Sequence, residues 1–351
     1  MTAVIPSIHV FNVDTPNNNR PGIAGKVALI GAFNTEETNP KLYVGLNDAI
    51  ADLGDDSTFN GCTVLEDLFV GASSILAVNI TTWTGSGDSK TPSKDLTVGK
   101  LSEALSKIKG EDFDILFIAG TLTNEYLPII TAFCDEVYEM KYPCGYTGYL
   151  NGAVADNIQL ASNAGDHCYG LLTQELSVNG TDKSALQSIA YYTGLIAGMN
   201  VGNTMTMKVV DGVTGVSPEY TFETGDSGKA LVEAGITTLR CIDRNNNRFV
   251  VINSEQPNGL DLYINRVRDY VVKEMSLSRY LGERNRRATL SEIEHMLSSL
   301  KEECVNNLDL LEDIQYSVKK KTSDCVDIYL DSLTFAGIIT RMNVYVRVEV
   351  E

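Results

Sequence analysis

Residues 26–33 read KVALIGAF, a short and continuous apolar run that is typical of a buried β-strand. The most apolar strand predicted in the chain is FDILFIA at residues 113–119. Between and after these two runs, helices are predicted at residues 46–53, 64–72, 101–108, 124–140 and 183–199, and strands at 75–81, 143–150 and 168–172. Strands that alternate with helices in this way predict an α/β core with a largely parallel sheet. Residues 85–94 are rich in Gly, Ser, Asp, Lys and Pro, which predicts a surface loop.

The alternation ends near residue 211, after which we expect a C-terminal α+β domain. A short helix at residues 228–234 is predicted to end at Gly235, and a hairpin is predicted at residues 237–253. Two amphipathic helices follow. Thr289-Leu290-Ser291-Glu292 has the pattern of a capping box, which predicts that the second helix begins there.

Both ends of the chain read as extended arms. Residues 2–13 are rich in β-branched residues, and residues 15–22, TPNNNRPG, form a polar linker full of helix and strand breakers. The chain ends with residues 343–350, NVYVRVEV, which alternate as in a half-buried strand. The predicted organisation is an N-terminal arm and linker at residues 1–22, an α/β core domain at 23–210, an α+β domain at 211–339 and a C-terminal arm strand at 340–351.

The charge and the cysteines exclude several classes of protein. The formal net charge is −18, whereas nucleic-acid binders normally carry a basic footprint, and an anionic membrane surface is disfavoured as a partner for the same reason. The acidity either maintains solubility or forms the exterior of an assembly. Seven scattered cysteines without a C-x-x-C pair indicate reduced thiols and neither a disulfide framework nor a zinc site.

No motif in the sequence supports catalysis, a cofactor or a metal. A dinucleotide site needs G-x-G-x-x-G directly after its strand, but Gly31 is followed by Ala-Phe-Asn-Thr-Glu-Glu, whose carboxylates would repel phosphate. Asp166-His167-Cys168 has the residue types of a nucleophilic triad, yet adjacent residues of a strand point to opposite faces. The three histidines are far apart in the sequence, which disfavours a histidine-rich metal site.

One segment is basic against the acidic background. Between Leu262 and Arg287 there are seven basic residues and three acidic ones, a local excess of +4. The segment is either a solvated helix face with internal ion pairs or a docking face for an acidic partner. Its basic residues are Arg266, Arg268, Lys273, Arg279, Arg284, Arg286 and Arg287.

Several segments, in the right order, resemble the tail sheath proteins of myophages, R-type bacteriocins and related contractile injection systems. Pro6-Ser7-Ile8-His9-Val10 resembles the opening strand of that family, with serine in place of the usual glycine, and Val27–Gly31 resembles its first core strand. The other matching segments are Leu65–Phe69 with Ile75–Asn79, Tyr192–Gly198, Leu231 with Gly235-Ile236 and Leu239-Arg240, Asn265–Tyr270, and the alternating stretches 326–330 and 344–350.

The resemblance implies a structural subunit of a contractile sheath and no enzyme. Such subunits form rings stacked helically around a tail tube, are linked by strand exchange between chains, and contract to drive the tube through an envelope. The implied partners are further copies of the chain, a tail tube protein, and baseplate and tail terminator proteins. Assembly is expected in the bacterial cytoplasm, as part of a phage tail or a phage-tail-like particle.

The resemblance assigns strand exchange to the two arms, and the basic residues named above are the candidates for contact with the tube. The candidate arm residues are Val4, Ile5, Ile8, Val10, Val344, Tyr345, Val346, Arg347 and Val348. An extra outer domain of the kind found in larger sheaths is not expected, because the core is of modest length. The alternatives are an α/β enzyme or small-molecule-binding protein with an unrecognised site, and another virion protein such as a tube or baseplate subunit.

Overall fold

The structure is a computed structural model that describes residues 25–85, 90–140, 142–275, 280, 286–322 and 325–337. The chain divides into two compact units after Met275. We call the described residues up to Met275 the large unit and those after it the small unit, and each is described by itself. Most residues of both arms, including all candidate arm residues, lie outside the described residues, as do Arg279 and Arg284.

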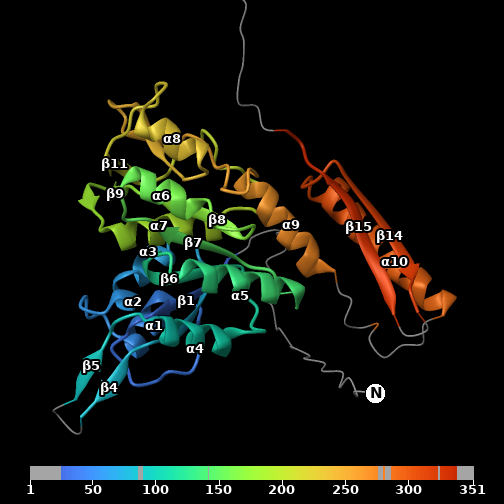
Figure 1. Ribbon diagram of the computed structural model, residues 1–351, viewed down its shortest axis with the longest axis horizontal. Helices are drawn as coiled ribbons and strands as arrows, with labels where there is room; N and C mark the ends of the chain where they lie inside the picture. Colours follow the sequence, from blue (N-terminus) through green and yellow to red (C-terminus); the bar gives the residue numbers. More distant parts are fainter. Residues whose placement is uncertain are drawn as a thin grey trace, which may run out of the picture. The chain divides into compact units, whose positions relative to one another are not determined.

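A six-stranded sheet forms the centre of the large unit (Figure 1). Its strand order is β2-β3-β1-β6-β7-β8, and all neighbouring pairs are parallel except β2 with β3. The strands are β1 (Lys26–Gly31), β2 (Lys41–Tyr43), β3 (Ser74–Asn79), β6 (Ile115–Thr121), β7 (Gly145–Tyr149) and β8 (Cys168–Leu172). The prediction of an α/β core with a largely parallel sheet is therefore confirmed.

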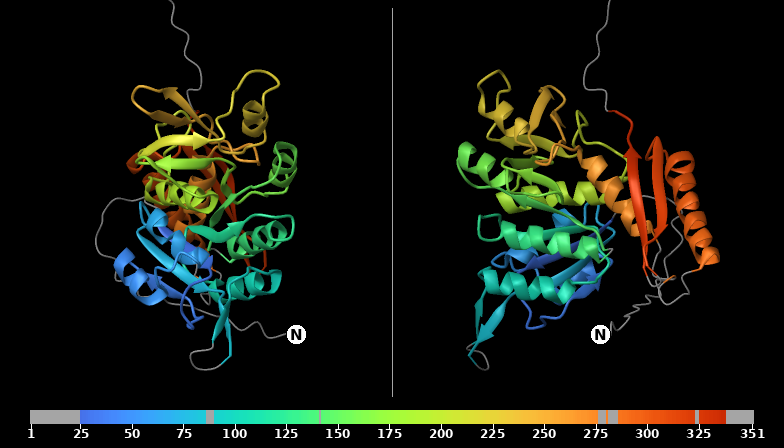
Figure 2. Two further views of the ribbon diagram at one scale, coloured as in Figure 1. Left: turned by 90° about the vertical axis from the view of Figure 1, so that its left-hand side faces the viewer. Right: turned by 45° about the vertical axis from the view of Figure 1, so that its right-hand side comes forward.

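Helices cover both faces of this sheet, which explains why its strands read as continuous apolar runs. Successive side chains of β1 enter different cores: Val27 and Leu29 pack with α3 and α7, whereas Ala28 and Ile30 pack with α4 and α5. The helices are α1 (Leu46–Leu53), α2 (Asn60–Thr63), α3 (Leu65–Leu68), α4 (Val98–Ile108), α5 (Leu127–Glu139), α6 (Val154–Ala161) and α7 (Ala185–Gly198). Figure 2 shows the α4 and α5 layer of the same unit from two further sides.

Small sheets and two helices complete the large unit. They are the hairpin β4 (Thr82–Thr84) and β5 (Thr91–Ser93), the sheet β10 (Thr181–Asp182), β9 (Glu175–Val178) and β11 (Val213–Ser217), the hairpin β12 (Leu239–Asp243) and β13 (Arg248–Val251), and the helices α8 (Ser227–Glu233) and α9 (Leu262–Glu274). Because β11 pairs with β9, the domain boundary that we expected at residue 211 falls inside a sheet. The expected surface loop at 85–94 contains β5, which pairs with β4.

The small unit consists of one long helix on a two-stranded antiparallel sheet. Its elements are α10 (Arg287–Glu302), the π-helical turn η3 (Glu303–Asn307), β14 (Asp313–Lys320) and β15 (Val326–Thr334). Figure 2 shows α10 along one face of the β14–β15 sheet. The predicted capping box was wrong, because α10 begins at Arg287 and its N-cap is Arg286, so Thr289 already lies in the first turn and is buried.

Most of the predicted core elements are present within one to three residues of their predicted ends. Helix α6 and strand β14 were not predicted, and β15 (Val326–Thr334) runs four residues beyond the alternating stretch 326–330. The predicted helix at 64–72 is instead the single turn α3, which follows directly on α2. Among the described residues, no helix is long and apolar enough to cross a membrane.

Candidate assembly surfaces and polar centres

The carboxyl edge of the parallel sheet is the first place to look for a ligand. In open α/β sheets, ligands bind where the strand order reverses, and here it reverses between β1 and β6. Asn60 closes this crevice: its side-chain oxygen accepts a hydrogen bond from the backbone nitrogen of Ala32 at 2.8 Å, and its nitrogen donates to the carbonyl of Ala119. A Cβ atom on Gly61 would lie 2.6 Å from the carbonyl oxygen of Ala32. The chain's own α2 therefore fills the position that a nucleotide would occupy.

Asn79 closes the neighbouring part of the same edge. Its side-chain oxygen accepts hydrogen bonds from the backbone nitrogens of Phe33 at 3.1 Å and Thr81 at 2.9 Å. Its side-chain nitrogen donates to the carbonyls of Thr35 at 2.7 Å and Glu37 at 3.1 Å. The amide thus uses all of its polar atoms to hold the segment after β1, and none of them is left for a ligand.

Arg266, in α9, is buried in the large unit with an exposed fraction of 2%. Its guanidinium donates hydrogen bonds to the carbonyls of Met199 at 2.8 Å and Asn200 at 3.3 Å, directly after the last residue of α7. A helix leaves its last carbonyls unpaired and carries partial negative charge at that end, so a buried cation is stabilised there. Burial nevertheless lowers the pKa of Arg266 to about 10, which keeps it charged at neutral pH.

Arg268 and Asp269 hold α9 against β8 and α5. Asp269, 4% exposed, accepts hydrogen bonds from the Tyr169 hydroxyl and from Arg268 Nε, both at 2.8 Å. Burial and the Asp269 carboxylate together raise the pKa of Tyr169, so the phenol remains a donor. His167 lies between two carboxylates, with Nδ1 4.0 Å from Asp269 and Nε2 3.4 Å from Asp135 on α5. This network is structural, since each of these polar groups meets another element of the same unit.

Lys273 fixes the last turn of α9. Its Nζ lies 2.5 Å from an oxygen of Asp112 and 2.8 Å from one of Asp114, and Asp112 also pairs with Lys26 at the start of β1. Burial alone would lower the pKa of Lys273, but the two carboxylates outweigh it and raise that pKa. The last turn of α9 is therefore held by ionic contacts within the large unit.

These contacts concern three of the seven basic residues of the basic segment. A tube-facing role is not supported for Arg266, Arg268 and Lys273, because all three are engaged with the large unit itself. The sequence offers no signal for this, since arginine and lysine are usually exposed and only the packing of α9 shows where they point. Arg286 and Arg287 are exposed, so their candidacy remains a prediction.

The Asp166-His167-Cys168 tripeptide is not a triad. Cys168 Sγ lies 3.7 Å from Gln256 Oε1, while the His167 ring packs beside Tyr138 with 5.1 Å between the ring centroids. Burial raises the pKa of the Cys168 thiol to about 12, which opposes formation of a nucleophilic thiolate. Within the described ranges, His, Cys, Asp and Glu side chains form no group that could hold a metal ion.

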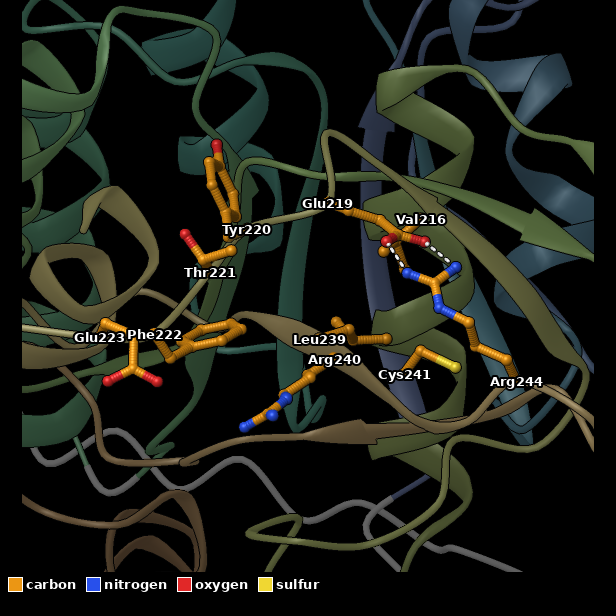
Figure 3. Close-up of a pocket in the computed structure, with 10 residues that line it drawn as sticks. All are labelled: Val216, Glu219, Tyr220, Thr221, Phe222, Glu223, Leu239, Arg240, Cys241 and Arg244. Atoms are coloured by element: carbon orange, nitrogen blue, oxygen red, sulfur yellow. Dashed lines mark hydrogen bonds and ion pairs between the residues drawn. The ribbon is translucent and has the colours of Figure 1, made fainter.

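A cavity of about 420 Å³ lies between the segment after β11 and the hairpin β12–β13 (Figure 3). Its two arginines already have partners. Arg244 forms a two-point contact with Glu219, at 2.6 and 3.4 Å, and the guanidinium of Arg240 lies 5.8 Å from the centre of the Phe222 ring. No pattern in the sequence indicates this cavity, because its walls come from two separate stretches of the chain.

The open feature of the small unit is the β14–β15 sheet. Each strand pairs only with the other in the described part of the chain, so both outer edges present backbone N–H and C=O groups. Ile314 of β14 is buried, which places an apolar core between α10 and the sheet. The small unit thus has a sheet with two free edges, and α10 packs against one face of this sheet.

Comparisons with known proteins agree with this geometry. Residues 94–253 match the family model of the phage tail sheath protein central domain. The sheath tail protein from Desulfitobacterium hafniense superimposes with a TM-score of 0.66 at 12% identity, covering 89% of this chain and 93% of that one. The sheath tail protein Lin1278 from Listeria innocua gives a TM-score of 0.62 at 12% identity over 85% of this chain and 89% of the other.

The helical sheath of the anti-feeding prophage in its contracted state gives a TM-score of 0.62 at 12% identity, over 100% of this chain and 99% of that one. No curated protein sequence matches the chain. The resemblance to contractile tail sheath proteins that the sequence indicates is thus confirmed: residues 94–253 match the model of the sheath central domain, and the fold is that of sheath proteins.

Proposed function

We propose that the chain is a structural subunit of a contractile tail sheath, which polymerises around a tail tube and contracts to drive the tube through a target envelope. The observation that carries this proposal is the sheath central domain joined to a small unit whose sheet has two open edges. The proposed partners are further copies of the chain, the tail tube protein, and baseplate and tail terminator proteins. The particle is a phage tail or a phage-tail-like device that is assembled in the bacterial cytoplasm.

The copies are linked by strand exchange onto the β14–β15 sheet. Residues 343–350, NVYVRVEV, alternate as a donor strand does, and residues 4–10 supply the candidate N-terminal donor. A donor strand of this length would form about six to eight backbone hydrogen bonds, each worth about 0.5–1.5 kcal/mol net. Every junction between copies then gains several kcal/mol, which suits a network that stays connected while its subunits rotate.

The residues proposed to contact the tube are Arg284, Arg286 and Arg287, and Arg279 lies near them in the sequence. Exposed ion pairs are worth about 0–1 kcal/mol each, so many of them hold an extended array while each one breaks easily. Reversal of the charge at Arg284, Arg286 and Arg287 should weaken binding to the tube and leave the melting temperature unchanged. Extended sheaths that form on the tube with unaltered salt sensitivity would remove these residues from the proposed contact.

We propose further that the chain has no catalytic activity. The support is the carboxyl edge of the sheet, which Asn60, Gly61 and Asn79 close with the chain's own atoms. An α/β enzyme with an unrecognised site is the alternative. Size-exclusion chromatography separates the two, because a sheath subunit forms very large particles whereas an enzyme forms a compact oligomer.

The decisive experiment removes residues 343–351. If these residues pair with other chains, the truncated protein should stay folded with a near-normal melting temperature and fail to form polymers in negative-stain images. A finer pair of variants keeps the length: Val346→Pro removes one backbone donor and fixes φ, and Val346→Thr is the control that preserves strand preference. A truncated chain that unfolds as a monomer would make the strand intramolecular, and one that still polymerises would make the arm dispensable.

A further inference from the structure

A patch on the outer edge of the large unit has the properties of an interface. Strand β2 pairs with β3 along one side, and its other side has no strand partner in the described residues. Leu42 in β2 is 54% exposed, and Val44, in the bend directly after β2, is 75% exposed. Two neighbouring apolar side chains this exposed, at an open sheet edge, are unfavourable in water unless something covers them.

Several carboxylates follow these two side chains closely in the sequence. Helix α1 follows directly and carries Asp48 and Asp52 on its exposed surface, and Asp55 follows the helix. Asp52 pairs with Lys41, whereas Asp48 and Asp55 take part in no ion pair among the described residues. We call Leu42, Val44, Asp48 and Asp55 the β2–α1 patch, an exposed set of apolar and acidic side chains.

The small unit carries a surface of the complementary kind. β14 ends with Lys319 and Lys320, Lys321 follows directly, and all three lysines are exposed. Lys321 Nζ lies 3.4 Å from Asp327 on β15. Tyr329 on β15, which pairs in register with Ser317, is 45% exposed, and the Lys319 Nζ lies 5.1 Å from the centre of its ring. We call the three lysines and Tyr329 the hairpin tip, a basic surface with an aromatic side chain.

The charge balance along the chain agrees with this pairing. Residues 1–275 contain 33 acidic and 18 basic residues, a net charge of −15, so two large units repel each other unless basic groups lie between them. The three lysines of the hairpin tip are the longest run of one basic residue type in the chain. Two different complementary surfaces on one chain form a heterologous contact, which repeats from copy to copy and generates rings or helices.

We infer that the β2–α1 patch of one copy binds the hairpin tip of a second copy, with the lysines among the carboxylates and Tyr329 against Leu42 and Val44. The inference rests on the proposed function, because it names one contact between copies in the sheath. It differs from strand exchange, since it joins side chains of the large unit to those of the small unit and needs neither arm.

A charge swap tests the contact. Reversing the tip with Lys319→Glu, Lys320→Glu and Lys321→Glu, or the patch with Asp48→Lys and Asp55→Lys, should each raise the concentration needed for polymerisation by about tenfold or more. That size follows because two exposed pairs, each worth up to about fivefold, change from attraction to repulsion. Combining both sets of changes should bring the concentration back to within about threefold of the wild-type value.

Melting temperatures of the monomers show whether the variants fold, and all five positions are exposed. Polymerisation that is unaffected by either set of changes would overturn the inference. So would a combined variant that remains as defective as the single sets, because the two surfaces would then act on other partners.

Cross-linking of the wild-type polymer tests the contact without any substitution. A carbodiimide joins a lysine amine to a carboxylate that it touches, so peptides containing residues 319–321 should be joined to peptides containing Asp48 or Asp55. In a polymer mixed from heavy- and light-isotope protein, hybrid pairs show that the link joins two copies. Links within one copy only, or none in a polymer that forms normally, would overturn this contact and leave the sheath proposal intact. Wild-type protein that never polymerises would instead refute the sheath proposal itself.

Discussion

Gly194 lies in the middle of α7, where this helix crosses α3 at very short range. A Cβ atom on Gly194 would lie 2.5 Å from the carbonyl oxygen of Asp67 and 2.8 Å from that of Leu68. Both neighbours are backbone atoms, so Gly194→Ala must push the two helices apart. Overpacking of this kind costs about 3 kcal/mol, and the higher helix propensity of alanine returns about 1 kcal/mol. We therefore expect the free energy of unfolding to fall by about 2 kcal/mol.

Gly99 supplies the matched control, because it also lies in a helix, α4, but a Cβ atom there has no atom within 4 Å. Gly99→Ala should raise the free energy of unfolding by about 0.5–1 kcal/mol. The assay is urea and thermal unfolding of the monomer, and the Gly194 variant should melt about 4–8 °C below the wild type. A Gly194→Ala protein as stable as the wild type, or a Gly99→Ala protein that loses as much, would refute the reasoning.

Three further predictions concern the polar centres of the large unit. Burial lowers the pKa of His167 below its ordinary 6.5, although the carboxylate of Asp269 opposes this, so the unfolded chain binds the proton first. The urea midpoint should therefore drop as the pH falls below about 6.5, and His167→Gln should flatten that decline; an unchanged slope would contradict it. Lys273→Met should lower the free energy of unfolding by about 2 kcal/mol, because it leaves two carboxylates with less compensation, and the loss should shrink in a Lys273→Met, Asp114→Asn protein. Asn79→Ala should cost about 3 kcal/mol by chemical denaturation through four lost hydrogen bonds, and a cost below about 1 kcal/mol would show that the segment after β1 is held by other contacts.

Patterning along the sequence predicted the core of the large unit well. The runs at residues 26–33 and 113–119 are buried strands because a parallel sheet covered on both faces needs apolar residues at every position. The helix predicted at residues 124–140 is α5 at Leu127–Glu139, and its Pro128 lies in the first turn, where a proline costs no hydrogen bond. These features depend on residues that are close together in the sequence.

The predictions differ from the structure where a local sequence pattern is compatible with more than one kind of element. The Thr289–Glu292 sequence matches a capping box, yet α10 starts at Arg287, because Thr289 is buried within the helix. Strand β14 was not predicted, although Ile314, Tyr316 and Val318 alternate, because a run of lysines follows them directly. Local preference is weak compared with burial, so the partner surface decides such cases.

By itself, the sequence determined the α/β class of the core, the order of its main strands and helices, and the resemblance to sheath proteins, since all three rest on apolar periodicity and segment order. Only the tertiary structure decided which charges are available to a partner. Arg266 and Lys273 look like members of a basic face, but one closes the end of α7 and the other sits between two carboxylates. The tertiary structure also decided that Asn60 fills the crevice between β1 and β6, and that Gly194 and Gly99 tolerate the same methyl group so differently. Each of these outcomes is set by contacts between atoms that are distant along the chain, and a sequence pattern does not show which of these atoms come within two or three ångströms of each other.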